Sequence, residues 1–259
     1  MIGYLGGPGV LQALPYRGGL ATSSDRPVSF QRTLGGKRKA FYGKASRREW
    51  GVSFDVIGSR DVAGLVAVSQ SPGPHSWYPA DAAAGNLLSP QASGFEVINY
   101  NGTDTGLVAL PDGSVARSVA LAGAVAVGGA HGGYEAVVVR PGVPVTAAGW
   151  GMGGVRFTLT WRDASLVSVG TAVSTAFTFS GWGFRSQTFT PPSNAAYASV
   201  TVQGATQVAR PSLAWGSTPQ DKPGRGCAKV VVHGLSEALT VVRPDDAYGS
   251  IDVTVTEVG

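Results

Sequence analysis

Residues 145–161 read VTAAGWGMGGVRFTLTW, in which apolar and polar or small side chains alternate on both sides of the glycine-rich piece 151–154. Alternation with a period of two is typical of a half-buried β-strand. The pattern predicts two strands, Val145–Trp150 and Val155–Trp161, joined by a turn at the glycines. Because Trp161 shares a strand face with other apolar residues, we expect it in the core.

Similar strand-like runs, separated by turn residues, follow along the middle of the chain. They are Ser114–Leu121, Tyr134–Val139, Ala176–Phe179, Ser186–Phe189 and Ala196–Gln203. Turns are predicted between them, for example at Pro111–Gly113 and Ser180–Gly183. Short strands at a spacing of roughly ten residues predict a two-sheet sandwich of jelly-roll type.

The composition supports an all-β fold. Glycine (38) and proline (16) exceed a fifth of the 259 residues, and they are scattered between short apolar runs. This distribution is typical of many short strands joined by tight turns. The single cysteine, Cys227, excludes a disulfide framework, and we expect it to be a small buried residue.

The chain divides into three predicted segments, 1–85, 86–222 and 223–259. The last segment holds only two strand-like runs, Ala228–His233 and Ser250–Val258. Two or three strands cannot form an independent core. We therefore expect the last segment to complete a discontinuous β-sandwich-type domain with the first, and the middle segment to be an inserted jelly roll.

The first segment is basic, with ten Lys and Arg against five acidic residues. Its alternating piece Glu49–Val56 predicts a strand. Arg60–Val68 predicts a short helix with Ser59 as the N-cap. Three interpretations of the densest basic run stay open: contact with DNA phosphates, contact with an acidic neighbouring subunit, or a solvated β-arm. The run comprises Lys37, Arg38, Lys39, Lys44, Arg47 and Arg48.

Several short motifs carry a resemblance to a known family. In the first and last segments they are RREWGVSF (47–54), WYP (77–79) with NLLSP (86–90), and SIDVTVTEV (250–258). With these motifs the chain resembles minor tail proteins of siphophages that infect actinobacteria, related to the distal tail protein family. In the middle segment, VRPGVPV (139–145), LTWRD (159–163) and TPP (190–192) resemble a carbohydrate-binding-module jelly roll.

The resemblance implies a structural virion protein that joins the tail tube to the tail tip and is assembled in the host cytoplasm. It implies a ring, which we expect to contain three or six copies, contacts with other tail-tip and tail-tube proteins, and a jelly roll facing host-wall glycan. Transient contact with DNA in the lumen follows from the first interpretation of the basic run. Two alternatives stay open, a stand-alone glycan-binding module and a cell-wall hydrolase with an unrecognised site.

The tryptophans are the candidate glycan contacts, because flat aromatic side chains pack on the apolar faces of sugar rings. Trp182 lies among small residues with Arg185 nearby, and it is the first candidate. Trp150, beside the predicted glycine turn, is compatible with either core or ligand contact. Trp50, Trp77 and Trp215 are expected to pack between domains or subunits.

Neither a catalytic nor a cofactor motif is recognisable. A Gly-x-Ser-x-Gly nucleophile elbow and a phosphate-binding loop are both absent from the sequence. His75, His131 and His233 lack the spacing of a zinc helix. We therefore name no catalytic residue and expect no enzyme and no cofactor, while one structural calcium ion stays open. Nor do we expect a secretory signal or a membrane span.

Overall fold

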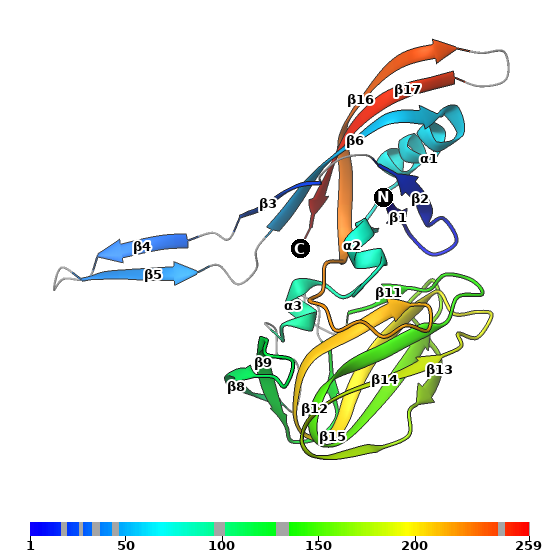
Figure 1. Cartoon of the computed structure of the whole chain (residues 1–259). Helices are drawn as coiled ribbons and strands as arrows, with labels where there is room; N and C mark the ends of the chain where they lie inside the picture. Colours follow the sequence, from blue (N-terminus) through cyan, green and yellow to red (C-terminus); the bar gives the residue numbers. More distant parts are fainter. Residues whose placement is uncertain are drawn as a thin grey trace. The chain divides into compact units, whose positions relative to one another are not determined.

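The computed structural model describes residues 1–16, 20–25, 28–32, 37–42, 47–95, 102–127, 135–242 and 247–258. The predicted all-β, sandwich-type class is confirmed, because every paired strand in these ranges belongs to an antiparallel sheet and the helices are short (Figure 1). Two compact units divide the chain. Unit 1 contains Met1, Pro15–His75 and Lys229–Gly259, and unit 2 contains Ile2–Leu14 and Ser76–Ala228.

Unit 1 is a sheet with the strand order β16-β17-β6-β3, accompanied by a helix and a separate hairpin. The hairpin consists of β4 and β5, which pair only with each other among the described residues. The elements are β3 (Ala21–Asp25), β4 (Val28–Arg32), β5 (Arg38–Tyr42), β6 (Arg47–Gly58), α1 (Ser59–Gln70), β16 (Cys227–Val242) and β17 (Ala247–Glu257).

Alternation in β6 produces the buried face of this sheet. Trp50, Val52 and Phe54 are buried, and the residues between them are exposed. They pair with Val255, Val253 and Ile251 of β17, so apolar side chains from both strands lie on one face. The strand predicted at Glu49–Val56 is therefore confirmed within β6.

Helix α1 confirms the prediction for Arg60–Val68 and contacts β6 and β17. The N-cap prediction is wrong, because Ser59 is the first helical residue and Gly58 occupies the cap without a side-chain hydrogen bond. The reason is local: β6 stays extended through Gly58 and leads directly into the helix.

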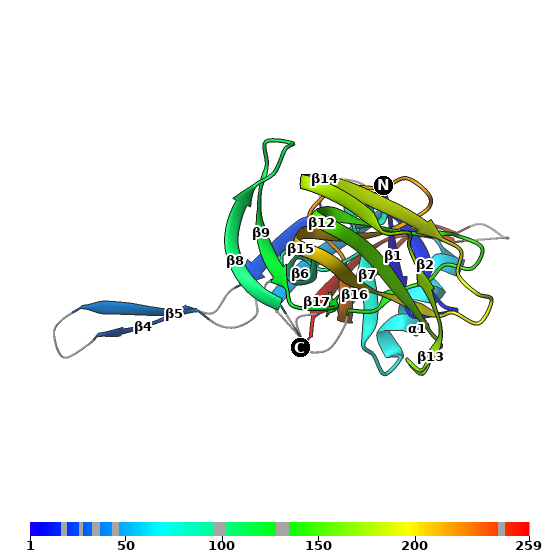
Figure 2. The same ribbon diagram turned by 90° about the horizontal axis from the view of Figure 1, so that it is seen from below.

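Unit 2 is built around a second sheet with the strand order β13-β12-β15-β9-β8. Strand β14 also pairs with β12 (Figure 2), and β10 and β11 pair with β15. The elements are β1 (Ile2–Gly6), β2 (Gln12–Pro15), β7 (His75–Tyr78), α2 (Ala80–Ala83), α3 (Pro90–Ser93), β8 (Gly102–Ala109), β9 (Val115–Leu121), β10 (Val125–Ala126), β11 (Val137–Val138), β12 (Val145–Arg162), β13 (Ser168–Val173), β14 (Phe177–Phe189) and β15 (Tyr197–Trp215).

Two predicted turns are wrong. Residues 151–154 and 180–183 lie inside the continuous strands β12 and β14, which therefore replace four shorter predicted strands. The register of β12 against β15 shifts at three places between Ala148 and Arg156. A glycine in a strand frequently marks a β-bulge, and Gly153 has a positive φ of 81°. The strands therefore bend at their glycines and continue, where the sequence suggested a reversal.

The core of unit 2 contains the apolar faces of the two long strands. Phe157, Leu159 and Trp161 of β12 are buried with Val200 and Val202 of β15, so the prediction for Trp161 is confirmed. Cys227 is also buried, as predicted.

One buried side chain fixes the segment that follows β15. Asn86 Nδ2 donates to the carbonyl oxygens of Pro211 (3.1 Å) and Lys222 (3.0 Å), and its Oδ1 accepts from the amides of Leu88 and Leu213. A buried amide that is fully hydrogen-bonded specifies one arrangement of the backbone around it. The turn-rich piece 217–226 is therefore held on unit 2, although it has no helix or strand of its own.

Candidate functional site

In the hairpin of β4 and β5, strand β4 exposes side chains on both of its faces. Val28 pairs with Tyr42, Phe30 with Ala40, and Arg32 with Arg38. All five residues of β4 are exposed, and the Phe30 side chain is 67% exposed. An isolated two-stranded hairpin is at best marginally stable in water. A phenylalanine that projects from such a hairpin is a candidate contact for another molecule.

The predicted basic run divides between this hairpin and the sheet of unit 1. Lys37, Arg38 and Lys39 are exposed at the start of β5, and Arg47 is exposed at the start of β6. Lys44 lies outside the described residues. The described part of the run therefore places three consecutive cations on the hairpin.

Arg48 does not belong with these exposed cations. Its Nε donates to Glu257 Oε2 at 2.9 Å and its second guanidinium nitrogen donates to Oε1 at 3.2 Å, with side chains 8% and 5% exposed. The guanidinium carbon also lies 4.9 Å from the centre of the Trp50 ring. Two parallel hydrogen bonds between Arg and a carboxylate are a strong, specific contact. Arg48 joins β6 to β17, so its assignment to the basic arm is corrected.

The candidate glycan contacts Trp150 and Trp182 lie near each other. Trp150 pairs with Phe184 across β12 and β14, and Met152 pairs with Trp182. Trp182 and Phe184 are half-buried against the cluster of Leu110, Trp150 and Ala209. Trp150 is 8% exposed, so only Trp182 and Phe184 present substantial aromatic surface here. Glycan binding by this surface stays a prediction.

Arg185 lies on the other face of β14. Successive residues of a strand point to opposite faces, and Arg185 directly follows Phe184. Its guanidinium carbon lies 4.7 Å from the ring centre of Phe179 and 5.5 Å from that of Phe177. The predicted grouping of Arg185 with Trp182 is therefore corrected, because the strand turns the two side chains in opposite directions.

Sequence reasoning missed a polar network beside Trp150. The indole nitrogen of Trp150 donates to Asp221 Oδ2 at 2.8 Å, and Arg210 donates to Asp221 Oδ1 at 3.1 Å. Arg210 also donates to Ser114 Oγ at 2.7 Å and contacts Asp112 at 3.4 Å. Hydrogen bonds from the Ser114 hydroxyl and amide, assisted by Arg210, hold the pKa of Asp112 below its usual value.

The backbone explains why this network is hard to foresee. Arg210 has a φ of 47°, in the left-handed region that non-glycine residues rarely occupy. Arg210 and Pro211 together lie opposite Gly149, because the register shifts between Ala148 and Trp150. The bulge aims the Arg210 guanidinium at residues far away in sequence, and no local pattern signals that direction.

A metal centre is not evident in the described part of the chain. Within the ranges given above, no group of three or more His, Cys, Asp or Glu side chains is placed to hold a metal ion. His75 is buried, His233 is exposed and lies 2.8 Å from Thr256 Oγ1, and His131 lies outside the described residues. None of the helices described here is long and apolar enough to cross a membrane.

The chain was compared with protein-family models, with curated proteins and with solved structures. No protein-family model and no curated protein matches the chain. Among solved structures, the chain is similar to the enzymatically active domain of tailspike protein 4 of bacteriophage CBA120. That similarity has a TM-score of 0.36 at 13% identity and covers 50% of this chain and 21% of the other.

Proposed function

We propose that this chain is a non-catalytic structural protein of a phage tail tip, which joins the tail tube to the tip complex and presents unit 2 to glycan on the host surface. Two observations support the proposal. The motifs at 47–54, 77–90 and 250–258 resemble minor tail proteins. The β4–β5 hairpin has the character of an element that is completed by a partner.

The hairpin is the observation that carries the structural role. Its strand β4 exposes every side chain, including Phe30, so no side chain of this strand is buried. Burial of apolar area against a partner would supply the stabilisation that two strands alone do not have. A neighbouring copy in a ring is the partner that we propose.

The charge of the hairpin indicates what kind of surface receives it. Lys37, Arg38 and Lys39 are exposed, and Arg32 is exposed opposite Arg38. Like charges directly opposite each other destabilise a hairpin, and a negatively charged partner removes this repulsion. The acidic surface of a neighbouring subunit meets this requirement. DNA phosphates in a tail lumen are the alternative, and salt-dependent DNA binding by the purified chain would favour them.

The test is the assembly state of the purified full-length chain, measured by mass photometry and negative-stain electron microscopy. We expect discrete rings of three or six copies. Phe30→Asp is expected to abolish them, because it places a charge in the proposed contact. Leu107→Asp is the matched control, since Leu107 is 75% exposed on β8 in the other unit, and it should leave the rings intact. A wild-type chain that stays monomeric at micromolar concentration would contradict the proposal.

A second candidate function is a glycan-binding module without a structural role. The half-buried aromatic surface of Trp182 and Phe184 favours it, since both side chains pack against the cluster that contains Trp150, whose ring centre lies 5.6 Å from that of Phe184. A strict monomer whose affinity for an oligosaccharide falls on Trp182→Ala would support this candidate over the first.

A further inference from the structure

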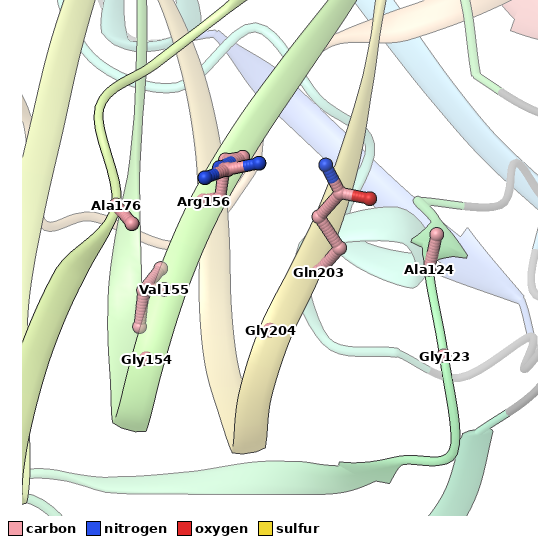
Figure 3. Close-up of a pocket in the computed structure, with 8 residues that line it drawn as sticks. All are labelled: Gly123, Ala124, Gly154, Val155, Arg156, Ala176, Gln203 and Gly204. Carbon is pink, nitrogen blue, oxygen red and sulfur yellow. The ribbon is translucent and has the colours of Figure 1, made fainter.

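A groove in unit 2 has none of the candidate glycan contacts Trp150, Trp182 and Arg185 among its lining residues. It has a volume of about 430 Å³, within the usual range of ligand pockets, roughly 300–1,000 Å³. Its floor is formed by β12 and β15 at their bulge, with Gly154, Val155 and Arg156 facing Gln203 and Gly204 (Figure 3). Ala176 borders one side, and Gly123 and Ala124 border the other. The groove is therefore assembled from four separate stretches of the chain.

The floor of the groove is bare backbone for a steric reason. A Cβ atom on Gly154 would lie 3.3 Å from the carbonyl oxygen of Gly204, and a Cβ on Gly204 would lie 3.3 Å from that of Gly154. Gly204 also has a φ of 81°, which side chains rarely tolerate. A side chain at either position would push the two strands apart by a few tenths of an ångström, so glycine at both positions permits their close approach. A flat ligand can come equally close to this floor.

Polar groups of two kinds stand beside the glycines. Arg156 and Gln203 are register partners on adjacent strands, so their side chains lie on the same face of the sheet. Figure 3 shows both beside Gly154 and Gly204. Arg156 is exposed, and no acidic side chain in the described part of the chain pairs with it. The Gln203 amide nitrogen donates to Thr158 Oγ1 at 3.3 Å, which orients the amide. The groove therefore offers an unneutralised guanidinium next to an oriented amide.

We infer that this groove binds an acidic saccharide through its carboxylate. A guanidinium presents two parallel donors that match the two oxygens of a carboxylate. The amide of Gln203 can bond sugar hydroxyls as donor and acceptor. The glycine floor and the methyl groups of Ala124 and Ala176 accept the apolar face of a pyranose ring. The inference rests on the glycan-binding part of the proposed function and gives it a second site and a substrate class.

The test is isothermal titration calorimetry of the full-length chain with trigalacturonate, its neutral methyl ester and glucose 6-phosphate. We expect trigalacturonate to bind with a dissociation constant on the order of millimolar, because the site is open and small. The methyl ester is expected to bind about tenfold more weakly, since it cannot accept the charge-assisted bonds. Tighter binding of the phosphate than of the carboxylate would overturn the assignment to an acidic sugar.

Three variants test whether trigalacturonate binding needs the two parallel donors of the Arg156 guanidinium or only a positive charge at that position. Arg156→Gln and Arg156→Lys are both expected to weaken trigalacturonate binding by about tenfold, because lysine keeps the charge but lacks the fork. Gln203→Ala should weaken it less. Arg117→Lys is the control, since Arg117 is an exposed arginine that already contacts Asp104 at 3.6 Å. Full retention of binding by either Arg156 variant would overturn the inference.

The outcome also distinguishes this inference from the proposed function. If trigalacturonate and its ester bind equally and only Trp182→Ala weakens them, glycan binding stands and the groove inference fails. If no saccharide binds, both glycan sites fail. Ring assembly through the β4–β5 hairpin is measured separately and is unaffected by either result.

Discussion

Two antiparallel strand pairs in this chain differ sharply in what surrounds them. The pair β12–β15 buries one face after its bulge, with Phe157, Leu159 and Trp161 against Val200 and Val202, and every residue of β12 from Val145 to Gly151 is buried. The hairpin β4–β5 has regular pairing too, yet every side chain of β4 is exposed. The two strand pairs therefore share regular backbone pairing and differ in whether their side chains are buried. The first pair stabilises its own unit, whereas the second has apolar surface available for a partner.

The largest effect that tests this comparison is expected from removing one aromatic ring in each pair. Phe157→Ala should lower the free energy of unfolding of the purified chain by about 3–5 kcal/mol, because it leaves a cavity in a buried core. Phe30→Ala should change it by less than about 0.5 kcal/mol in the monomer, because exposed residues contribute little. Urea denaturation followed by tryptophan fluorescence measures both. A comparable loss in the two variants would mean that the hairpin is packed within the monomer.

A second pair of variants compares a buried ion pair with an exposed one. Glu257→Ala should destabilise the chain by about 3 kcal/mol, because it leaves the Arg48 charge buried without its carboxylate. Asp104→Ala removes the partner of Arg117, where both side chains are about 40% exposed, and should cost at most about 0.5 kcal/mol. Thermal melting of the two variants at the same salt concentration gives the comparison. If the melting temperature of Glu257→Ala equals that of the wild type, Arg48 does not depend on Glu257 and belongs with the exposed cations Lys37, Arg38 and Lys39.

A third prediction tests whether Asn86 holds residues 217–226 on unit 2. Asn86→Ala is expected to destabilise the chain by about 2 kcal/mol and to make residues 217–226 sensitive to trypsin, because buried backbone groups lose their partners. The control Asn194→Ala changes an exposed loop asparagine and should have no such effect. Limited proteolysis with mass spectrometry locates the cleavage. Unchanged protection of 217–226 would show that other contacts hold this segment.

The smallest effect concerns Asp112 and depends on pH. Its pKa in the folded chain lies below its usual value of 3.8, so its carboxylate stabilises the fold above that value and loses this contribution as the pH falls through the lowered pKa. Asp112→Asn should therefore lower the melting temperature slightly at pH 7 and not at all in strong acid. Calorimetry at both pH values measures the difference. If the gap in melting temperature between Asp112→Asn and the wild type grew as the pH fell, the Asp112 carboxylate would not stabilise the fold in the way expected.

Much of the architecture could be predicted from alternation. The pattern of Trp50, Val52 and Phe54 located β6, and that of Phe157, Leu159 and Trp161 located half of β12, because burial on one face imposes a period of two. The breaks in the pattern were harder to interpret. Glycines at 151–154 and 180–183 suit a turn and a bulge equally well, and only the long-range pairing of β12 with β15 and β14 makes them bulges.

Less of the candidate sites than of the fold could be predicted from the sequence. Composition and alternation by themselves determined the all-β class, the basic run that contains Lys37, Arg38 and Lys39, and the tryptophans that are candidate glycan contacts. The tertiary structure alone decided that Arg48 is buried on Glu257, that Arg185 faces away from Trp182, and that Arg156 stands beside Gln203 over two glycines. The physical reason is that strand periodicity is a local property, recorded in neighbouring residues. Charge pairing and groove formation join residues that only the folded register brings together.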